Sequence, residues 1–238
     1  DAGATAYVKV EIPAAWANAV DTAAPEAKKG PEKTVKMVKS ILNPVDKMDG
    51  DSLPVSAFVG MEDGQFPLGV AAYEKRGVAA FVPTWEPENC IQCNKCAFVC
   101  PHACIRPFVM DDTEAAGVNG AMIDMKAPAP MKGMKFRIQV GVMDCLGCGN
   151  CADVCPSKDK ALVMKPLQSQ EAEQKNFDYL HSHIGYKDNV QPKAQNVKNA
   201  QFAQPLFEFS GACAGCGETP YIKLVLSLIH ISEPTRRR

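Results

Sequence analysis

The sequence lacks any large excess of charge of one sign, because 26 Lys and Arg residues stand against 27 Asp and Glu residues in a chain of 238. Nucleic-acid binding relies on basic side chains that neutralise phosphates, so the composition argues against nucleic acid as the main partner. Long hydrophobic runs are also missing. The most apolar run, residues 221–231, is shorter than the roughly 20 residues that a membrane-spanning helix needs. We therefore expect no membrane anchor.

The N-terminus lacks the features of a signal peptide, since it has no starting Met, no basic region and no long apolar core. Residues 7–13 alternate like the end of a strand, and Ala-, Lys- and Pro-rich sequence follows. We interpret residues 1–30 as the end of a preceding domain and a linker. Nothing indicates export, so we expect a reducing compartment, either the cytoplasm or an organelle of an anaerobic eukaryote.

Residues 31–84 have the pattern of a small mixed α/β domain. Pro31 suits the first turn of a helix, and the apolar residues that follow share one helical face until residues 43–44 end it. Turn residues then separate short apolar runs, from which we expect a fold that leans towards β-structure. The charged triplet at residues 74–76 is most simply a solvated turn.

Residues 85–167 consist mainly of an internal repeat, whose first apolar run starts slightly before them, near Phe81. Each copy contains an apolar run, a cysteine run that ends in Pro, and a second apolar run. The alternation at Phe136, Ile138 and Val140 predicts a half-buried strand that leads into the second cysteine run. We expect two related halves packed with pseudo-twofold symmetry, with an inserted surface loop at residues 111–133.

Eight cysteines form two runs with the spacing Cys-x2-Cys-x2-Cys-x3-Cys-Pro, placed fifty-five positions apart. This is the spacing of bacterial-type ferredoxins, in which three thiolates hold one [4Fe-4S] cluster and the fourth reaches the other cluster. Soft thiolates suit iron–sulfide cores, and backbone N–H groups of Gly-rich loops can donate to the sulfur atoms. Structural zinc usually takes two separated Cys-x2-Cys pairs, fewer ligands than each run supplies, and would bring no redox change. Disulfides would leave one of eleven cysteines unpaired.

Cross-ligation divides the eight cysteines into two sets, each with three members from one run and one from the other. The first set is Cys90, Cys93, Cys96 and Cys155. The second set is Cys145, Cys148, Cys151 and Cys100. Two clusters held close together by one fold would relay single electrons, because electron tunnelling falls off steeply with distance.

Three cysteines lie outside the two runs. We expect Cys104 to pack as a small apolar side chain rather than to act as a spare redox thiol. Cys213 and Cys216 supply half of a four-ligand set: either they bind a third cluster with cysteines beyond the end of the chain, or they are structural thiols at a tight turn. His102 is most simply a surface residue or a neighbour of a ligand.

The part of the chain after Pro166 is polar and has no clear period, so we expect an extended connector at residues 168–205. Residues 206–210 resemble a strand that leads into a Gly-rich turn, where small residues let the backbone crowd around a ligand. We expect a new domain to begin at residues 206–226.

Four stretches of the sequence resemble the pyruvate:ferredoxin (flavodoxin) oxidoreductases, the large thiamine-diphosphate enzymes of anaerobic metabolism that are also called pyruvate synthases. They are TVKMVKSILNP at 34–44, GVAAYEKRG at 69–77, WEPENC at 85–90 and GACAGCGETPY at 211–221. The triplet at 74–76 matches the one after which the family's small EKR domain is named. The resemblance extends over about residues 7–225.

The resemblance implies oxidative decarboxylation of pyruvate with coenzyme A to acetyl-CoA and CO2, with ferredoxin or flavodoxin receiving the electrons through three [4Fe-4S] clusters. It assigns Cys213 and Cys216 to the cluster nearest the thiamine and Glu218 to a position that contacts thiamine diphosphate. Other parts of the family's sequence, including the site for Mg and diphosphate, have no counterpart here. The resemblance therefore implies a fragment of a longer enzyme, homodimeric at full length, that does not turn over pyruvate unaided.

The sequence after residue 226 fits no continuation of the preceding motif. Our hypothesis is that residues 227–238 are a non-native tail, a translated sequencing adapter joined to a truncated reading frame. The fold we expect is α+β, with a ferredoxin-like two-cluster domain between an EKR-type domain and the start of a thiamine-diphosphate-binding domain. The alternative is a 2[4Fe-4S] ferredoxin-type carrier, free or as a subunit of another oxidoreductase.

Overall fold

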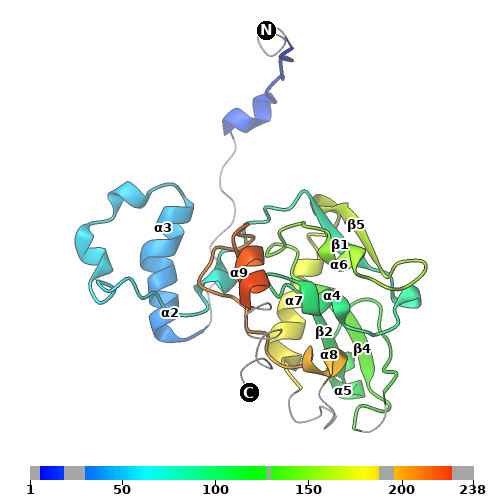
Figure 1. Ribbon diagram of the computed structural model, residues 1–238. Coiled ribbons are helices and arrows are strands. Elements are labelled where there is room, and N and C mark those ends of the chain that lie inside the picture. Colours follow the sequence, from blue (N-terminus) through cyan, green and yellow to red (C-terminus); the bar gives the residue numbers. More distant parts are fainter. Residues whose placement is uncertain (1–5, 19–29, 128–129, 188–195, 227–238) are drawn as a thin grey trace.

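The computed structural model describes residues 6–18, 30–127, 130–187 and 196–226. Figure 1 shows a small helical domain with α2 (Glu32–Met37) beside a larger body of strands and helices, and α9 (Thr219–Leu226) between them. Residues 227–238, expected as a non-native tail, and residues 19–29 of the expected linker lie outside the described residues. In the described parts, every helix is too short or too polar to cross a membrane.

The small domain begins with one continuous helical segment made of α2, a π-helical turn η2 (Val38–Leu42) and α3 (Asn43–Asp46). It starts after Pro31, as expected, and buries Val38 and Ile41. The expected end at residues 43–44 is wrong by a few residues, because Pro44 lies in the first turn of α3, where its missing N–H is tolerated.

The rest of the small domain consists of turns, so the expected β-leaning fold is wrong. Residues 30–80 contain no strand, and the 3₁₀ turns are η3 (Gly50–Ser52), η4 (Val55–Phe58) and η5 (Val70–Tyr73). Their hydrogen bonds are local, such as the Ala57 N–H to the Pro54 carbonyl at 2.9 Å. The expected strands at residues 7–13 and 206–210 are likewise absent from these described segments.

The larger body contains two antiparallel sheets whose pairing follows the internal repeat. In the first, β1 (Phe81–Trp85) pairs with β5 (Leu162–Pro166). In the second, β4 (Lys135–Val140) lies between β2 (Ile105–Met110) and β3 (Ile123–Asp124). The strand that precedes each cysteine run therefore pairs with the strand that follows the other run, which is the pairing that pseudo-twofold packing requires.

Short helices complete the larger body. A helix follows each cysteine loop, and the others lie in the connections. These elements are η6 (Pro87–Asn89), α4 (Lys95–Val99), α5 (Asp112–Ala115), α6 (Asn150–Asp153), η7 (Leu167–Ser169), α7 (Glu173–Tyr179), η8 (Leu180–Ile184) and α8 (Val197–Ala200). The remaining short helix, η1 (Ala14–Asn18), belongs to the N-terminal segment, and all of its residues are exposed.

The described residues 168–187 of the expected connector are not extended, because α7 and the π-helical turn η8 pack against the sheet that contains β2 and β4. Leu180 and Ile184 share a buried cluster with Phe108 and Met110 of β2. This layer covers the second face of the sheet, which a half-buried strand would have left exposed to solvent.

Strand β4 forms where the alternation predicted it, but it is buried on both faces rather than one. Its polar residues are satisfied by Glu173 of α7: Arg137 Nη2 and Gln139 Nε2 donate to Glu173 Oε2 at 3.0 and 2.9 Å. A buried guanidinium without such a partner would be costly. The alternation of apolar and polar residues therefore predicted the strand correctly, but the polar residues of the strand face α7 rather than solvent.

The main core gathers around Phe136, which is fully buried. Its ring makes edge-to-face contacts with Trp85 at 6.2 Å and Phe202 at 6.5 Å between centroids. Met125 and Met131 are buried in the same core. The inserted segment 111–133 is therefore a surface loop only in part, since it also carries α5, β3 and core residues.

Candidate metal centres

The two cysteine loops share a backbone conformation. The residues between the first and second cysteines, Gln92 and Gly147, have φ of 58° and 75°. The residues after the second cysteines, Asn94 and Gly149, have φ of 58° and 79°. The internal repeat thus extends to the positions where each loop turns through the left-handed region.

The two copies reach this conformation by different means. A Cβ on Gly147 would come within 2.9 Å of both Ala79 Cβ and the Phe81 carbonyl oxygen, so glycine is required there. The first copy instead has Gln92, whose buried amide donates to the Asp124 carbonyl at 2.7 Å and accepts from the Lys126 N–H at 2.7 Å.

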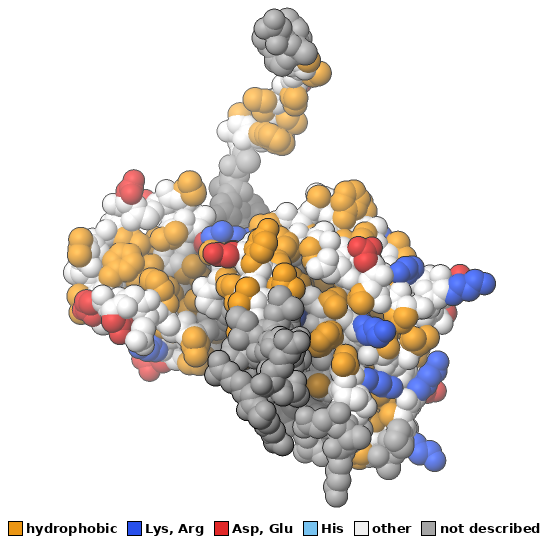
Figure 2. All heavy atoms as spheres, viewed as in Figure 1, with side chains coloured by type: hydrophobic (Ala, Val, Ile, Leu, Met, Phe, Trp, Pro, Cys, Tyr) orange, Lys and Arg blue, Asp and Glu red, His pale blue; other side chains and the backbone are white. Residues whose placement is uncertain are grey.

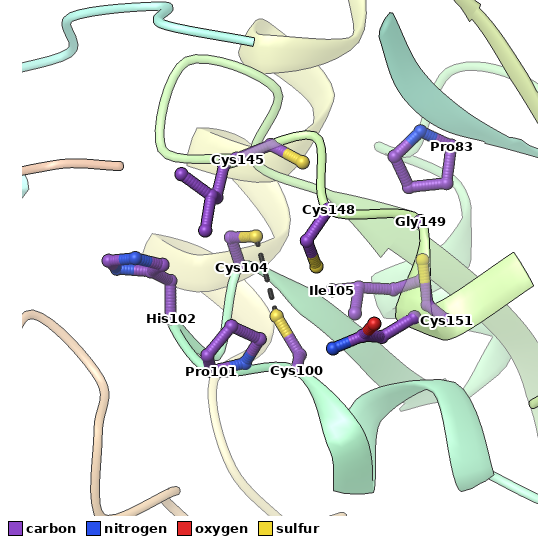
Figure 3. Close-up of a pocket in the computed structure, with 12 residues that line it drawn as sticks. Pro83, Cys100, Pro101, His102, Cys104, Ile105, Cys145, Cys148, Gly149 and Cys151 are labelled. Atoms are coloured by element: carbon purple, nitrogen blue, oxygen red, sulfur yellow. Dashed lines mark hydrogen bonds between the residues drawn. The ribbon is translucent and has the colours of Figure 1, made fainter. Parts of the chain in front are cut away.

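The second set of cysteines lines one cavity, in which Cys145, Cys148 and Cys151 meet Cys100 of the first run. Figure 3 shows these side chains approaching a common space from different chain segments. About 360 Å³ among them is not filled by protein atoms, part of it open to solvent.

The first set lines a similar cavity, in which Cys90, Cys93 and Cys96 meet Cys155 of the second run. About 340 Å³ is unfilled, and Trp85 and several aliphatic side chains form an apolar wall. The structure therefore groups the eight thiols three plus one, twice, as cross-ligation requires. That these thiols bind clusters stays a prediction.

The donor chemistry of both cavities fits [4Fe-4S] clusters. The Gly147 N–H donates to Cys145 Sγ at 3.3 Å and the Ala161 N–H to Cys155 Sγ at 3.4 Å, as outer donors to cluster sulfur do. Burial, with neighbouring thiolates, raises the pKa of Cys151 to about 12. Four thiolates gathered around one small cavity repel one another unless a cationic core lies among them. A four-iron core holds its ligands farther apart than a single metal ion does. In the described residues, no group of three His, Cys, Asp or Glu side chains is arranged to bind a single metal ion.

Cys104 is buried in the core, as expected, but it also lines the second cavity. Its Sγ lies 3.5 Å from Cys100 Sγ (Figure 3). The hydrogen bond between the two thiols lowers the pKa of Cys100, despite its burial. Sequence reasoning missed this proximity, although a cysteine four residues after a predicted ligand was a signal that could have found it.

Comparison with known proteins agrees with this geometry. A family model described as a 4Fe-4S dicluster domain matches residues 89–158, and the EKR model, described as a domain of unknown function, matches residues 22–79. The pyruvate:ferredoxin oxidoreductase of Moorella thermoacetica is 49% identical over 230 residues, which are 96% of this chain and 19% of that protein. The pyruvate-flavodoxin oxidoreductase of Enterobacter agglomerans is 49% identical over 228 residues, with the same coverage.

The chain is a homologue of one segment of these oxidoreductases. It spans about a fifth of their length, and the resemblance inferred from its motifs is confirmed. A further relative, the mitochondrial pyruvate dehydrogenase [NADP(+)] of Euglena gracilis, is 43% identical over 221 residues, 92% of this chain and 12% of that protein. The segment that contains the dicluster and EKR domains thus has counterparts in proteins whose names specify three different electron acceptors, namely ferredoxin, flavodoxin and NADP(+).

The Cys213–Cys216 loop lies against the second set of the dicluster domain. His102 Nε2 is 2.7 Å from the Cys216 carbonyl oxygen, and Lys223 Nζ of α9 donates to the Cys100 carbonyl at 2.7 Å. His102 is therefore a half-buried bridge to this loop rather than a surface residue. Cys213 is exposed. No pair of cysteines in the described residues completes a third four-thiol cavity with this loop.

Glu218 lies on the exposed surface directly before α9. Its carbonyl oxygen accepts the N–H groups of Tyr221 and Ile222 in the first turn of the helix, and the side chain remains accessible. The carboxylate is therefore accessible, and that Glu218 contacts thiamine diphosphate stays a prediction.

The charged triplet of the EKR domain is not a solvated turn. The Glu74 side chain is 3% exposed, and Lys75 Nζ donates to Asp144 Oδ2 of the dicluster domain at 2.6 Å. Burial raises the pKa of Asp144, although Lys75 acts to lower it. The expectation failed because the partners of the triplet are distant in sequence.

Proposed function

We propose that the dicluster domain relays single electrons between two [4Fe-4S] clusters in a pyruvate:ferredoxin (flavodoxin) oxidoreductase. Cys90, Cys93, Cys96 and Cys155 hold one cluster, and Cys145, Cys148, Cys151 and Cys100 hold the other. The observation that carries the proposal is the grouping of these thiols, from both runs, around two small cavities.

The position of the Cys213–Cys216 loop supports an order for the relay. In this proposal the two cysteines hold half of a third cluster, the one nearest the thiamine. Because the loop contacts His102, two residues after Cys100 of the second set, and Lys223 of the following helix α9 contacts the Cys100 carbonyl, electrons would enter the dicluster domain at the second set and leave from the first.

The complete enzyme would convert pyruvate and coenzyme A to acetyl-CoA, CO2, one proton and two electrons. Thiamine diphosphate and Mg would supply the decarboxylation chemistry when bound, and Glu218 would contact the former. Residues 206–226 would begin the thiamine-binding domain. Ferredoxin or flavodoxin is the proposed acceptor, on the names of the relatives in Moorella thermoacetica and Enterobacter agglomerans.

The exposed apolar face of α9 supports a place within a larger protein. Tyr221, Ile222, Leu224 and Val225 are all substantially exposed, and Figure 2 shows apolar side chains gathered over this helix. Apolar patches of this kind are typical of surfaces that other protein covers. We also propose that the complete enzyme is a homodimer and that it works in a reducing compartment, the cytoplasm.

Anaerobic reconstitution of the chain with iron and sulfide tests the relay. We expect about eight iron and eight sulfide ions per chain and, after reduction with dithionite, EPR signals from two interacting clusters. Zinc uptake without an EPR signal would overturn the proposal in favour of a structural metal module. A free ferredoxin-type carrier would give the same spectra but would not need the EKR domain, so deletion of that domain would leave electron transfer intact.

A further inference from the structure

We propose that Glu74, Lys75 and Arg76, here called the EKR clamp, hold the Cys213–Cys216 loop at a fixed distance from the second set of cysteines. The inference rests on the proposed electron relay and gives a role to the triplet of a domain described as having unknown function. It concerns positioning, since none of the three side chains is a cluster ligand.

Glu74 connects the small domain to the loop itself. Its Oε2 accepts the Ala214 N–H at 2.7 Å, and Ala214 lies between the two cysteines of the loop. Its Oε1 accepts from Arg76 Nε at 2.6 Å, so both carboxylate oxygens are occupied. A nearly buried carboxylate with two partners forms strong charge-assisted hydrogen bonds and keeps one geometry.

Lys75 connects the same turn to the dicluster domain. It donates to Asp144, the residue directly before Cys145 of the second set. Its ammonium also lies 5.2 Å from the centroid of the Phe209 ring, within cation–π range, in the segment that leads to the loop. One side chain thus touches both structures whose spacing matters.

The turn that carries the clamp is itself anchored on both sides. Arg76 pairs with Asp46 at the end of α3 at 3.4 Å, and the Gly77 N–H donates to the Met143 carbonyl at 2.9 Å. Lys75 has a φ of 48°, a backbone conformation that a non-glycine residue holds only when its surroundings determine it.

The loop needs external bonds to hold its position. Its sequence from Gly211 to Gly217 contains three glycines and two alanines, so it has few side chains with which to pack. The small domain holds it at Ala214 through Glu74, and the dicluster domain holds it at Cys216 through His102. A cavity lined by residues from all three parts, including Ala71, Asp144 and Cys213, marks where they meet.

Fixed spacing matters because a one-electron step slows steeply as the distance between two centres grows. If the triplet only stabilised the fold, its removal would lower global stability and leave the loop no looser than the rest of the protein. If it is a clamp, its removal frees the loop while both clusters of the dicluster domain remain.

The test compares hydrogen exchange in the whole reconstituted chain and in three variants. In Glu74→Ala we expect the Ala214 amide to exchange roughly 10- to 100-fold faster, the effect of losing a hydrogen bond to a charged acceptor. Glu74→Gln keeps an acceptor oxygen and should restore much of the protection. The matched control is Glu62→Ala, which removes a carboxylate that accepts the Gly60 N–H at 2.9 Å within the small domain and does not reach the loop.

A distance measurement separates positioning from stability. A nitroxide on Cys213, in a Cys216→Ser background, would report its distances to the reduced clusters, and Glu74→Ala should broaden their distribution. Lys75→Met should broaden it as well, and it decides the matter if Glu74→Ala does not fold. Unchanged exchange and distances, with full iron content, would overturn the clamp and leave the relay standing. Absence of clusters from the unsubstituted chain would instead overturn the relay, and exchange at Ala214 would still decide the clamp.

Discussion

Replacement of Cys155 by Ala separates cross-ligation from the simpler arrangement in which each run holds its own cluster. Cys155 belongs to the second run, but its thiol lines the cavity of Cys90, Cys93 and Cys96. We therefore expect Cys155→Ala to impair the cluster of the first set and to leave the cluster of the second set in place.

The size of the effect follows from the composition of the two cavities. Each is lined by four thiols of its set, so loss of one [4Fe-4S] cluster lowers the content from about eight to about four iron ions per chain. The cavity of Cys155 has no fifth lining cysteine that could replace the missing ligand. The EPR spectrum of the reduced protein should change from that of two interacting clusters to that of one isolated cluster.

The reciprocal variant is Cys100→Ala, which should impair the cluster of the second set. It needs a double variant, Cys100→Ala with Cys104→Ala, because the Cys104 thiol lies 3.5 Å from that of Cys100 in the same cavity. Cys104→Ala alone should retain about eight iron ions. If Cys155→Ala lost the cluster of Cys145, Cys148 and Cys151 and kept the other, cross-ligation would be refuted.

Three further substitutions test the loops and the packing around them. Gly147→Ala should lower the iron content, and it should lower the free energy of unfolding by roughly 1–3 kcal/mol. Gly149→Ala should lower the free energy of unfolding less, because Gly149 has a similar φ but no atoms lie where its Cβ would be. Leu180→Ala should lower the free energy of unfolding in urea by about 2–5 kcal/mol, whereas the exposed Val197→Ala should change it little. Equal small effects would show that α7 and η8 do not pack into the core. Glu208→Gln should destabilise by roughly 3 kcal/mol at pH 7, since it removes the charge paired with buried Arg106. Although burial acts to raise the pKa of Glu208, its hydrogen bonds and charged neighbours lower it, so this contribution is present above the unfolded pKa and is lost as pH falls through the folded one. Urea unfolding at pH 7 and pH 3 should show the two proteins converge in acid, and a constant difference would contradict this account.

Much of the dicluster domain could be predicted because its information is local. The spacing of the cysteines limits how far apart their thiols can lie, and the cross-ligation rule assigns Cys100 and Cys155 to opposite cavities. The strand at Phe136–Val140 followed from alternation, and the first helix followed from Pro31. In each case a few neighbouring residues carry the whole signal.

The helical segment after Pro166 shows how a local signal can be missed. Phe177, Leu180 and Ile184 recur at helical spacing and are all buried, but polar residues surround them in sequence. One of those polar residues, Glu173, satisfies the buried side chains of Arg137 and Gln139 in β4. A polar composition was therefore wrongly taken as evidence of an exposed connector.

Contacts between distant segments could not be predicted from spacing. Lys75 meets Asp144 across 69 positions and Glu74 meets Ala214 across 140. The same charged triplet on an unpartnered turn would be solvated, so its sequence alone carried no sign of its role. Local spacing was enough to predict the two sets of thiols that the structure groups and the strand that leads into the second run, because covalent connectivity limits local geometry. The burial of the Glu74 side chain, the second buried face of β4 and the position of the Cys213 loop arise when separate segments pack and exclude water, and that depends on the whole folded chain.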